Sequence, residues 1–327
     1  MKAKLNIEAC FHARGDWARG QGGGGAQARM LANGMVLTRA LPLLYVKNSA
    51  GGSDNARMTQ DFTTQTMTLA AGAGMCSLSQ LLGACDALMQ PQSFHDYAPN
   101  GLQVQGKPDV QRLVCGVTAS RALIEAAIAA GADALLVHHG LFWRGQSQCV
   151  TGWMRERLRL LLTHDISLLA YHLPLDAHPE LGNNAQLAVR LGLEVQGNFG
   201  EHDLGFIGQR AGGGAFASAA ALHTMLEREL QHSVLCVDGS GGAPLERIAW
   251  CSGGAQGWLQ AAIDAGAQAF ITGEASEPQP HLARECGVAF FACGHHATER
   301  YGVQALAQRV AGQFGIACQF VDINNPA

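Results

Sequence analysis

Three segments that lie far apart in the chain each end an apolar run with side chains that bind metal ions. The runs are ALLVHHG, SLLAYHLPLD and FFACGHHATE, and each is typical of a buried strand. The side chains at their ends are His138, His139, His172, Asp176, His295, His296 and Glu299. Imidazoles and carboxylates suit a divalent transition metal, and side chains at the ends of neighbouring strands meet at one edge of an open α/β sheet. The chain is therefore predicted to bind metal ions.

In two of these segments, the spacing of the residues indicates which of them can serve the same metal site. Adjacent strand residues point to opposite faces, so His138 and His139 serve one site only if the strand ends there, as the following glycine indicates. A surface histidine pair is the alternative. His295 and Glu299 are four residues apart, which puts both on one face of a helix. His296 points about 100° away on such a helix and ranks below His295.

In the remaining segment, Pro174 ends the strand, and the loop after it can turn Asp176 toward the same cleft. An aspartate that caps a helix or a turn is the alternative. Five ligands are predicted, namely His138, His139, Asp176, His295 and Glu299. Five exceed the need of one tetrahedral ion, and two carboxylates, one of them able to bridge, fit two metal ions ~3.5–4 Å apart. His172 is expected to move protons or to orient a ligand.

From residue 111 onward, strand patterns alternate with helix patterns. Strands are expected over 111–118, 132–139, 166–172, 247–253, 267–273, 288–294 and 318–323. Helices are expected over 120–131, 152–163, 183–192, 255–266, 277–286 and from about 296. Such alternation predicts an α/β fold with mostly parallel sheets covered by helices.

The two halves of this pattern resemble one another. Residues 112–139 align without a gap over 247–274, and eight of 28 positions are identical. A chance likeness of two strand–helix–strand units is the alternative to a true repeat. The hypothesis is two related α/β lobes with the metal site in the cleft between them. Glu274 then faces the cleft in the position of His139 and is a candidate for proton transfer.

This reading divides the chain into four parts. The parts are an N-terminal extension at 1–74, a first lobe at 75–193, a short middle segment at 194–245 and a second lobe at 246–327. The extension contains GGGG and shows no sustained period, so it is expected to be disordered. Met75 opens an amphipathic helix pattern, which raises the hypothesis that the functional chain begins there.

Composition excludes several classes of function. Residues 75–327 carry 14 Lys and Arg against 22 Asp and Glu, which argues against nucleic acid as a partner. The cysteines are scattered without C-x-x-C, so zinc bound by thiolates is not expected. No P-loop occurs, and no G-x-G-x-x-G follows the first expected strand, which argues against a dinucleotide-dependent oxidoreductase. No apolar run is long enough to span a membrane, no signal peptide is evident, and a cytoplasmic location is expected.

Four stretches of the sequence resemble one known family. They are GVTASRALIEAAIAAGADALLVHHGLFWRG, YHLPLDAHPELGNNAQLA, FITGEASE and GHHATERYG. They resemble the Nif-three-like family of GTP cyclohydrolase I type 2 homologs, most closely its bacterial YbgI-type members, over about 75–327. The resemblance implies two related lobes, a dinuclear metal centre and a ring-shaped homohexamer. Its ligands carry over to the same five residues, His138, His139, Asp176, His295 and Glu299.

The function expected from the residues and the resemblance is a metal-dependent hydrolase that acts on a nucleotide or related small molecule. The alternative is a non-enzymatic metal-binding scaffold for metal handling or for a protein partner. Zinc, iron, manganese and nickel all suit the ligands. The sequence shows no basic cluster for a triphosphate, and the candidate cations are Arg144, Arg155, Arg157 and Arg300.

Overall fold

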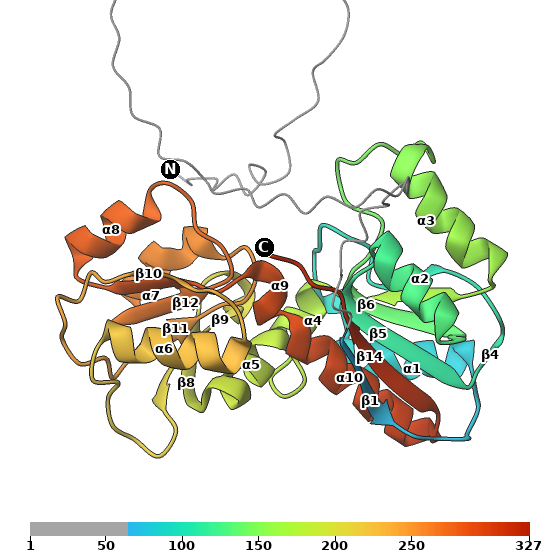
Figure 1. Cartoon of the computed structure of the whole chain (residues 1–327), viewed down its shortest axis with the longest axis horizontal. Coiled ribbons are helices and arrows are strands. Elements are labelled where there is room, and N and C mark those ends of the chain that lie inside the picture. The colour runs from blue at the N-terminus through green and yellow to red at the C-terminus, as the bar shows by residue number, and fades with distance from the viewer. Residues whose placement is uncertain (1–64) are drawn as a thin grey trace, which may run out of the picture. The chain divides into compact units, whose positions relative to one another are not determined.

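Two six-stranded mixed sheets organise residues 65–327, the part of the chain that the computed structural model describes (Figure 1). The strands of the first sheet are, in order, β1 (Gln65–Ala70), β14 (Ala317–Asp322), β5 (Arg112–Thr118), β6 (Ala134–His139), β7 (Ser167–Ala170) and β3 (Gly101–Val104). Those of the second are β10 (Leu235–Val237), β13 (Ala289–Ala292), β12 (Ala269–Thr272), β11 (Ile248–Trp250), β9 (Gly205–Arg210) and β8 (Leu193–Phe199).

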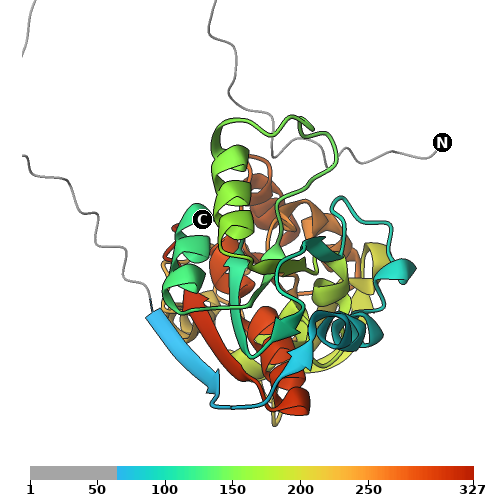
Figure 2. The ribbon, with the colours of Figure 1, turned by 90° about the vertical axis from the view of Figure 1, so that its right-hand side faces the viewer.

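The first sheet has helices on both faces. Its four inner strands, β14, β5, β6 and β7, are parallel, and antiparallel strands β1 and β3 form its edges (Figure 2). The helices α1 (Leu78–Met89) and α10 (Arg300–Phe314) cover one face, and α2 (Arg121–Ala129) and α3 (Gly152–Thr163) cover the other. Because both faces are buried, β5, β6 and β7 each contain a continuous run of buried, mostly apolar residues rather than an alternating pattern. A short strand pair, β2 (Cys76–Ser77) with β4 (Asp109–Val110), lies beside α1.

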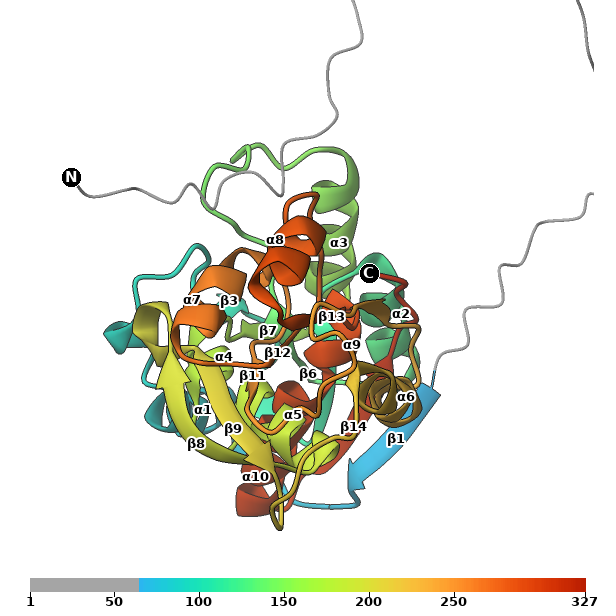
Figure 3. The same ribbon diagram turned by 90° about the vertical axis from the view of Figure 1, so that its left-hand side faces the viewer.

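The second sheet is built in the same way. Strands β11, β12 and β13 are parallel, and antiparallel pairing adds β10 beside β13 and β9 with β8 beside β11 (Figure 3). One face packs against α5 (Asn183–Leu191) and α6 (Ala219–Leu230). The other packs against α7 (Leu259–Asp264) and α8 (Gln279–Cys286). Among the described residues, no helix has the length and apolar character needed to cross a membrane.

Helices α5 and α10 connect the two sheets. Helix α10 packs on the first sheet, α5 packs on the second, and the two helices contact one another. The short helices α4 (Leu173–Ala177) and α9 (His295–Thr298) also contact α10, and Figure 1 shows all four helices between the sheets. This arrangement brings the ends of β6, β7 and β13 toward one region.

The predicted alternation from residue 111 is confirmed, and α3 has the predicted bounds. The predicted division into lobes differs from the structure in two places. Residues 194–245 are not a separate middle segment, because β8, β9 and β10 belong to the second sheet. The end of the chain does not belong to the second lobe, because α10 and β14 pack into the first sheet. Local periodicity predicts a strand or helix but does not say which sheet it joins.

The expected N-terminal extension also differs at its end. Residues 65–70 form β1, which pairs with β14, instead of being disordered. The rest of the extension, residues 1–64, lies outside the described residues. The helix expected after Met75 is α1, which begins at Leu78 behind a capping box formed by Ser77 and Gln80. A functional start at Met75 stays a prediction.

Candidate metal centre

The first sheet contributes four of the predicted site residues from the ends of two neighbouring strands. His138 and His139 are the last two residues of β6. His172 follows β7 and immediately precedes α4, which carries Asp176. Because β6 and β7 are parallel, their carboxyl ends lie at the same edge of the sheet. The pairing of β6 with β7 therefore brings these two segments together, as expected.

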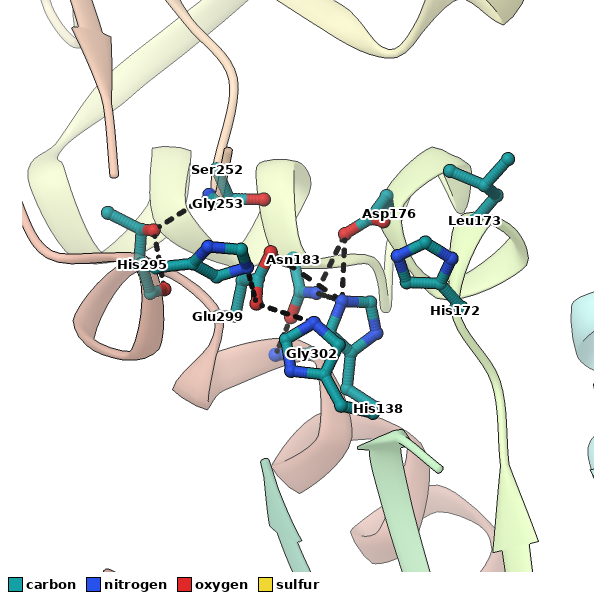
Figure 4. Close-up of polar contacts among 12 residues, drawn as sticks. His138, His172, Leu173, Asp176, Asn183, Ser252, Gly253, His295, Glu299 and Gly302 are labelled. Carbon is teal, nitrogen blue, oxygen red and sulfur yellow. Dashed lines mark hydrogen bonds and ion pairs between the residues drawn. The ribbon is translucent and has the colours of Figure 1, made fainter. Parts of the chain in front are cut away.

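The second sheet contributes the other residues from the ends of β13 and β12. His295 is the first residue of α9, and Glu299 lies at the break between α9 and α10. Glu274 follows β12. In Figure 4, His295 and Glu299 approach His138 and Asp176 from the opposite side. The five predicted ligands thus come from both sheets.

Glu299 lies at the centre of this cluster. Its Oε1 is 3.6 Å from His138 Nε2, and its Oε2 is 3.3 Å from His139 Nε2 and 3.1 Å from His295 Nε2. Asp176 Oδ1 lies 3.5 Å from His138 Nε2. Glu299 is 4% exposed, so these groups interact away from bulk water. One carboxylate therefore faces imidazoles of both sheets.

Within the described part of the chain, three groups of residues bring potential ligand atoms within 4.8 Å of one another. The groups are His138 with Asp176 and Glu299, His139 with His295 and Glu299, and His138 with His139 and His172. The first two share Glu299, whose buried Oε2 has no hydrogen bond of good geometry among the described residues, although imidazole nitrogens lie 3.1 and 3.3 Å away. A buried carboxylate oxygen without a well-formed hydrogen bond is costly unless a cation or donor satisfies it. The donor set of imidazoles and carboxylates therefore fits divalent metal ions.

Hydrogen bonds to the far side of each imidazole orient the rings. His138 Nδ1 lies 2.9 Å from the carbonyl oxygen of Tyr171, and His295 Nδ1 lies 2.6 Å from Glu274 Oε1. His139 Nδ1 lies 3.1 Å from Thr118 Oγ1. These contacts leave each Nε2 facing Glu299, as in metal sites where a second hydrogen bond fixes the imidazole.

Asp96 is a site residue that the sequence analysis missed. Its Oδ1 accepts a hydrogen bond from His172 Nδ1 at 2.7 Å, and its Oδ2 accepts from the Leu173 amide and from Asn100 Nδ2, both at 2.9 Å. Burial opposes ionisation, but the bond with His172 lowers the pKa of Asp96 to about 2. The only sign of this role in the sequence is the stretch HDYAPN at 95–100, whose composition is also typical of an ordinary turn.

Asn183 was noted in the sequence only as the start of a helix. In the structure it is fully buried, and its Nδ2 donates to Asp176 Oδ1 at 2.9 Å (Figure 4). The same nitrogen is 3.4 Å from His138 Nε2, while Asn183 Oδ1 accepts from the Gly302 amide at 3.1 Å. Asn183 thus ties the site to the first turns of α10.

Gly253 is required by the close approach of the second sheet to Glu299. Its φ is +67°, and a Cβ at this position would lie 2.0 Å from Glu299 Oε1 and 3.1 Å from His295 Nε2. The Gly253 amide donates to Thr298 Oγ1 at 3.0 Å, which holds the loop against α9. Any side chain here would displace the carboxylate.

The charges of the cluster compensate one another. Burial opposes protonation of His138 and His295. The carboxylates of Asp176 and Glu299 nevertheless raise the pKa of His138 to about 9. Glu299 and Glu274 likewise raise the pKa of His295 to about 11. Burial lowers the pKa of His139 well below its usual range and raises the pKa of Asp176. Burial also opposes ionisation of Glu299, but the neighbouring imidazoles of His295 and His138 hold its pKa well below the usual range.

The remaining predicted residues lie around this cluster. The rings of His172 and His138 have centroids 5.2 Å apart, so His172 adjoins the site. Glu274 contacts the cluster through His295. His296 is placed away from it, as ranked, because its Nε2 bonds Asp322 Oδ1 at 2.7 Å. Arg300 is not available for a phosphate, since it binds Asp322 and the Leu230 carbonyl oxygen.

Comparisons with known proteins agree on one family. Residues 76–326 match DUF34/NIF3, the NGG1p interacting factor 3 family. A Yersinia pestis protein named GTP cyclohydrolase 1 type 2 homolog is 54% identical over 238 residues, 72% of this chain and 93% of that protein. A Pseudomonas aeruginosa protein of the same name is 50% identical over 254 residues, 77% of this chain and 99% of that protein. The solved structure of protein ybgI, of unknown function, has a TM-score of 0.74 and 44% identity over 77% of this chain and 100% of that one.

Proposed function

The chain belongs to the DUF34/NIF3 family, as its motifs indicated, and on this basis we propose that it is a metal-dependent hydrolase of a nucleotide or related small molecule. The proposed site holds two divalent metal ions. The ligands are His138, His139, Asp176, His295 and Glu299. The proposal rests on one observation, the sharing of Glu299 by two ligand groups from different sheets.

The shared carboxylate supports two ions rather than one. Oε1 of Glu299 faces His138, which also contacts Asp176, while Oε2 faces His139 and His295. The two oxygens thus face imidazoles of two different ligand groups. Buried Oε2 lies close to two imidazole nitrogens but has no hydrogen bond of good geometry among the described residues, and a bound cation would compensate for this lack. Zinc, iron, manganese and nickel are all compatible with these ligands.

Metal ions in such a site activate water and stabilise the charge that develops on the reacting oxygens. The chain itself supplies a group able to accept a proton. A carboxylate as acidic as Asp96 can only accept a hydrogen bond, so His172 carries its proton on Nδ1. In the neutral tautomer with its proton on Nδ1, the lone pair of His172 is on Nε2, and the ring adjoins those of His138 and His139.

Glu274, the other residue predicted to transfer protons, is proposed to act in a different way. Its carboxylate accepts a hydrogen bond from His295 Nδ1 at 2.6 Å, and this bond lowers the pKa of Glu274. A carboxylate bound to the far nitrogen of a metal-binding imidazole fixes the ring and raises its basicity. We therefore assign Glu274 to the orientation of His295.

Two measurements test this proposal. Elemental analysis of the natively purified protein is expected to find about two metal ions per chain, and fewer than one would contradict a dinuclear site. A nucleotide screen with the matched metal is then expected to reveal turnover that Asp176→Asn removes without unfolding the protein. No turnover with any nucleotide or nucleoside under any metal loading would favour the scaffold alternative.

The proposed duplication is supported by strand register. Leu113 of β5 pairs with Ala134 of β6, and Ile248 of β11 pairs with Ala269 of β12. Both pairs are related by the offset of 135 residues at which the two sequence segments align. We propose that each sheet grew from one such strand–helix–strand unit. We also propose a ring-shaped homohexamer, for which light scattering would have to give six times the chain mass.

A further inference from the structure

Trp143 lies beside the proposed metal centre without belonging to its ligands. It follows β6 closely, in the loop that begins at Gly140, and it is half-buried. The centroid of its ring is 5.0 Å from that of His172 and 5.8 Å from that of His139. An aromatic surface thus adjoins both a proposed ligand and the proposed proton acceptor.

The residue after Trp143 lines an adjoining surface hollow. The Arg144 amide donates to the Tyr97 carbonyl oxygen at 2.7 Å, and its guanidinium donates to the Asp96 carbonyl oxygen at 2.9 Å. The hollow measures about 500 Å³, and its lining includes Phe94, Asp96 and Arg144. This volume is in the range of sites for small molecules. Asp96 belongs to the lining, and its buried carboxylate bonds His172, so the hollow and the metal cluster are neighbours.

The lining carries little net charge. Among the described residues that line it, Arg144 is the only arginine and there is no lysine. The other candidate arginines are engaged elsewhere: Arg155 pairs with Glu156, and Arg157 lies over the Trp153 ring. Sites for polyphosphates use several backbone amides and basic side chains together. This hollow is poorly suited to a triphosphate.

Building on the proposed hydrolase, we propose that Trp143 and the adjoining hollow bind a planar heteroaromatic ring that carries little negative charge. The substrate class is then a nucleoside rather than a nucleoside triphosphate. The ring would stack on the indole, which is a favourable contact for any base. His172 and the ligand His139 would lie next to it.

A second hollow lies on the other side of the metal cluster and does not offer the same contact. It measures about 400 Å³ and is lined by Glu274, Gly273 and Gly294 among others. None of the described residues that line it is Phe, Tyr or Trp. A planar ring would therefore find an aromatic partner on the Trp143 side and not on the Glu274 side.

The test is equilibrium dialysis of the full-length, zinc-loaded protein against guanosine and against GTP, with excess magnesium present so that GTP does not remove the zinc. Guanosine is expected to bind at least as tightly as GTP. Trp143→Ala is expected to weaken guanosine binding roughly 10- to 100-fold, the usual loss for a base–aromatic stack. Trp153→Ala, which removes a 55% exposed tryptophan from α3, is the matched control and should leave binding unchanged.

Three results would overturn the inference: guanosine binding undetectable at millimolar concentration, GTP binding tenfold tighter than guanosine, or Trp143→Ala binding like the native protein. Elemental analysis of the same samples separates this inference from the proposed function. Native protein without metal would refute the metal centre, whereas full metal loading with unchanged guanosine affinity in Trp143→Ala would refute only the role of the indole.

Discussion

Replacement of Glu299 by glutamine tests the electrostatics of the site most directly. Glu299 Oε1 lies 3.6 Å from His138 Nε2, and at an effective dielectric constant of about 20 this separation corresponds to about 5 kcal/mol. One pKa unit corresponds to ~1.4 kcal/mol, so the carboxylate accounts for roughly 3 units. Glu299→Gln should therefore lower the pKa of His138 in the metal-free protein from about 9 to roughly 6.

The sign of the stability effect follows from the same shift. The pKa of His138 in the folded protein is above the ~6.5 of an unfolded chain. Its interaction with Glu299 therefore stabilises the metal-free fold fully below pH ~6.5, and this stabilisation is lost as the pH rises through 9. The stability difference between native protein and Glu299→Gln should shrink across that interval.

Histidine NMR titration of metal-free protein measures the pKa, and elemental analysis measures metal content. Glu299→Gln should also lose both metal ions, because the carboxylate belongs to both ligand groups. The control is Glu277→Gln, which removes an 85% exposed carboxylate that pairs with His281 four residues on. An unchanged His138 titration in Glu299→Gln, or two retained metal ions, would refute the reasoning.

Three further variants examine the surroundings of the site and the fold. Gly253→Ala should displace Glu299 and abolish metal binding with a native circular dichroism spectrum; retention of both metal ions would contradict the close approach. Asp96→Asn should keep the metal content but reduce turnover roughly 10- to 100-fold, because its single oxygen is needed by the Leu173 amide and the amide NH2 then faces His172 Nδ1 and favours the other tautomer; unchanged kcat would argue against this role. Asp133 accepts two backbone amides and a lysine ammonium, which lower its pKa against partial burial. Its stabilisation is therefore present above pH ~3.9 and lost as the pH falls further, and Asp133→Asn should cost about 1–2 kcal/mol at pH 7 in chemical denaturation but little at pH 2.

Much of the fold follows from local pattern. The apolar runs ending at His139 and before His295 were predicted as strands, and β6 and β13 occupy them. The helix predicted over 152–163 has those bounds in the structure. Strand and helix periods are encoded over a few residues, so a single sequence is enough to recognise them.

The local pattern did not predict which of the two sheets each strand joins. Strand β14 resembles the strands before it in sequence, yet it pairs with β5 rather than with β13. Helix α10 precedes β14, and the apolar side of that helix packs on the first sheet, which places β14 in that sheet. Pairing between distant strands depends on how whole faces pack, and no local period records it.

The types of residue in the sequence indicated the chemistry of the site but not its geometry. Imidazoles and carboxylates at the ends of apolar runs were enough to predict a metal site and to name His138, His139, Asp176, His295 and Glu299. Only the tertiary structure placed Glu299 between imidazoles of both sheets and added Asp96 and Asn183, which carry no distinctive local pattern. The physical reason is that these two properties depend on interactions over different distances along the chain. A ligand's chemistry belongs to its own side chain, but its neighbours are decided by the packing of α5 and α10 between two sheets.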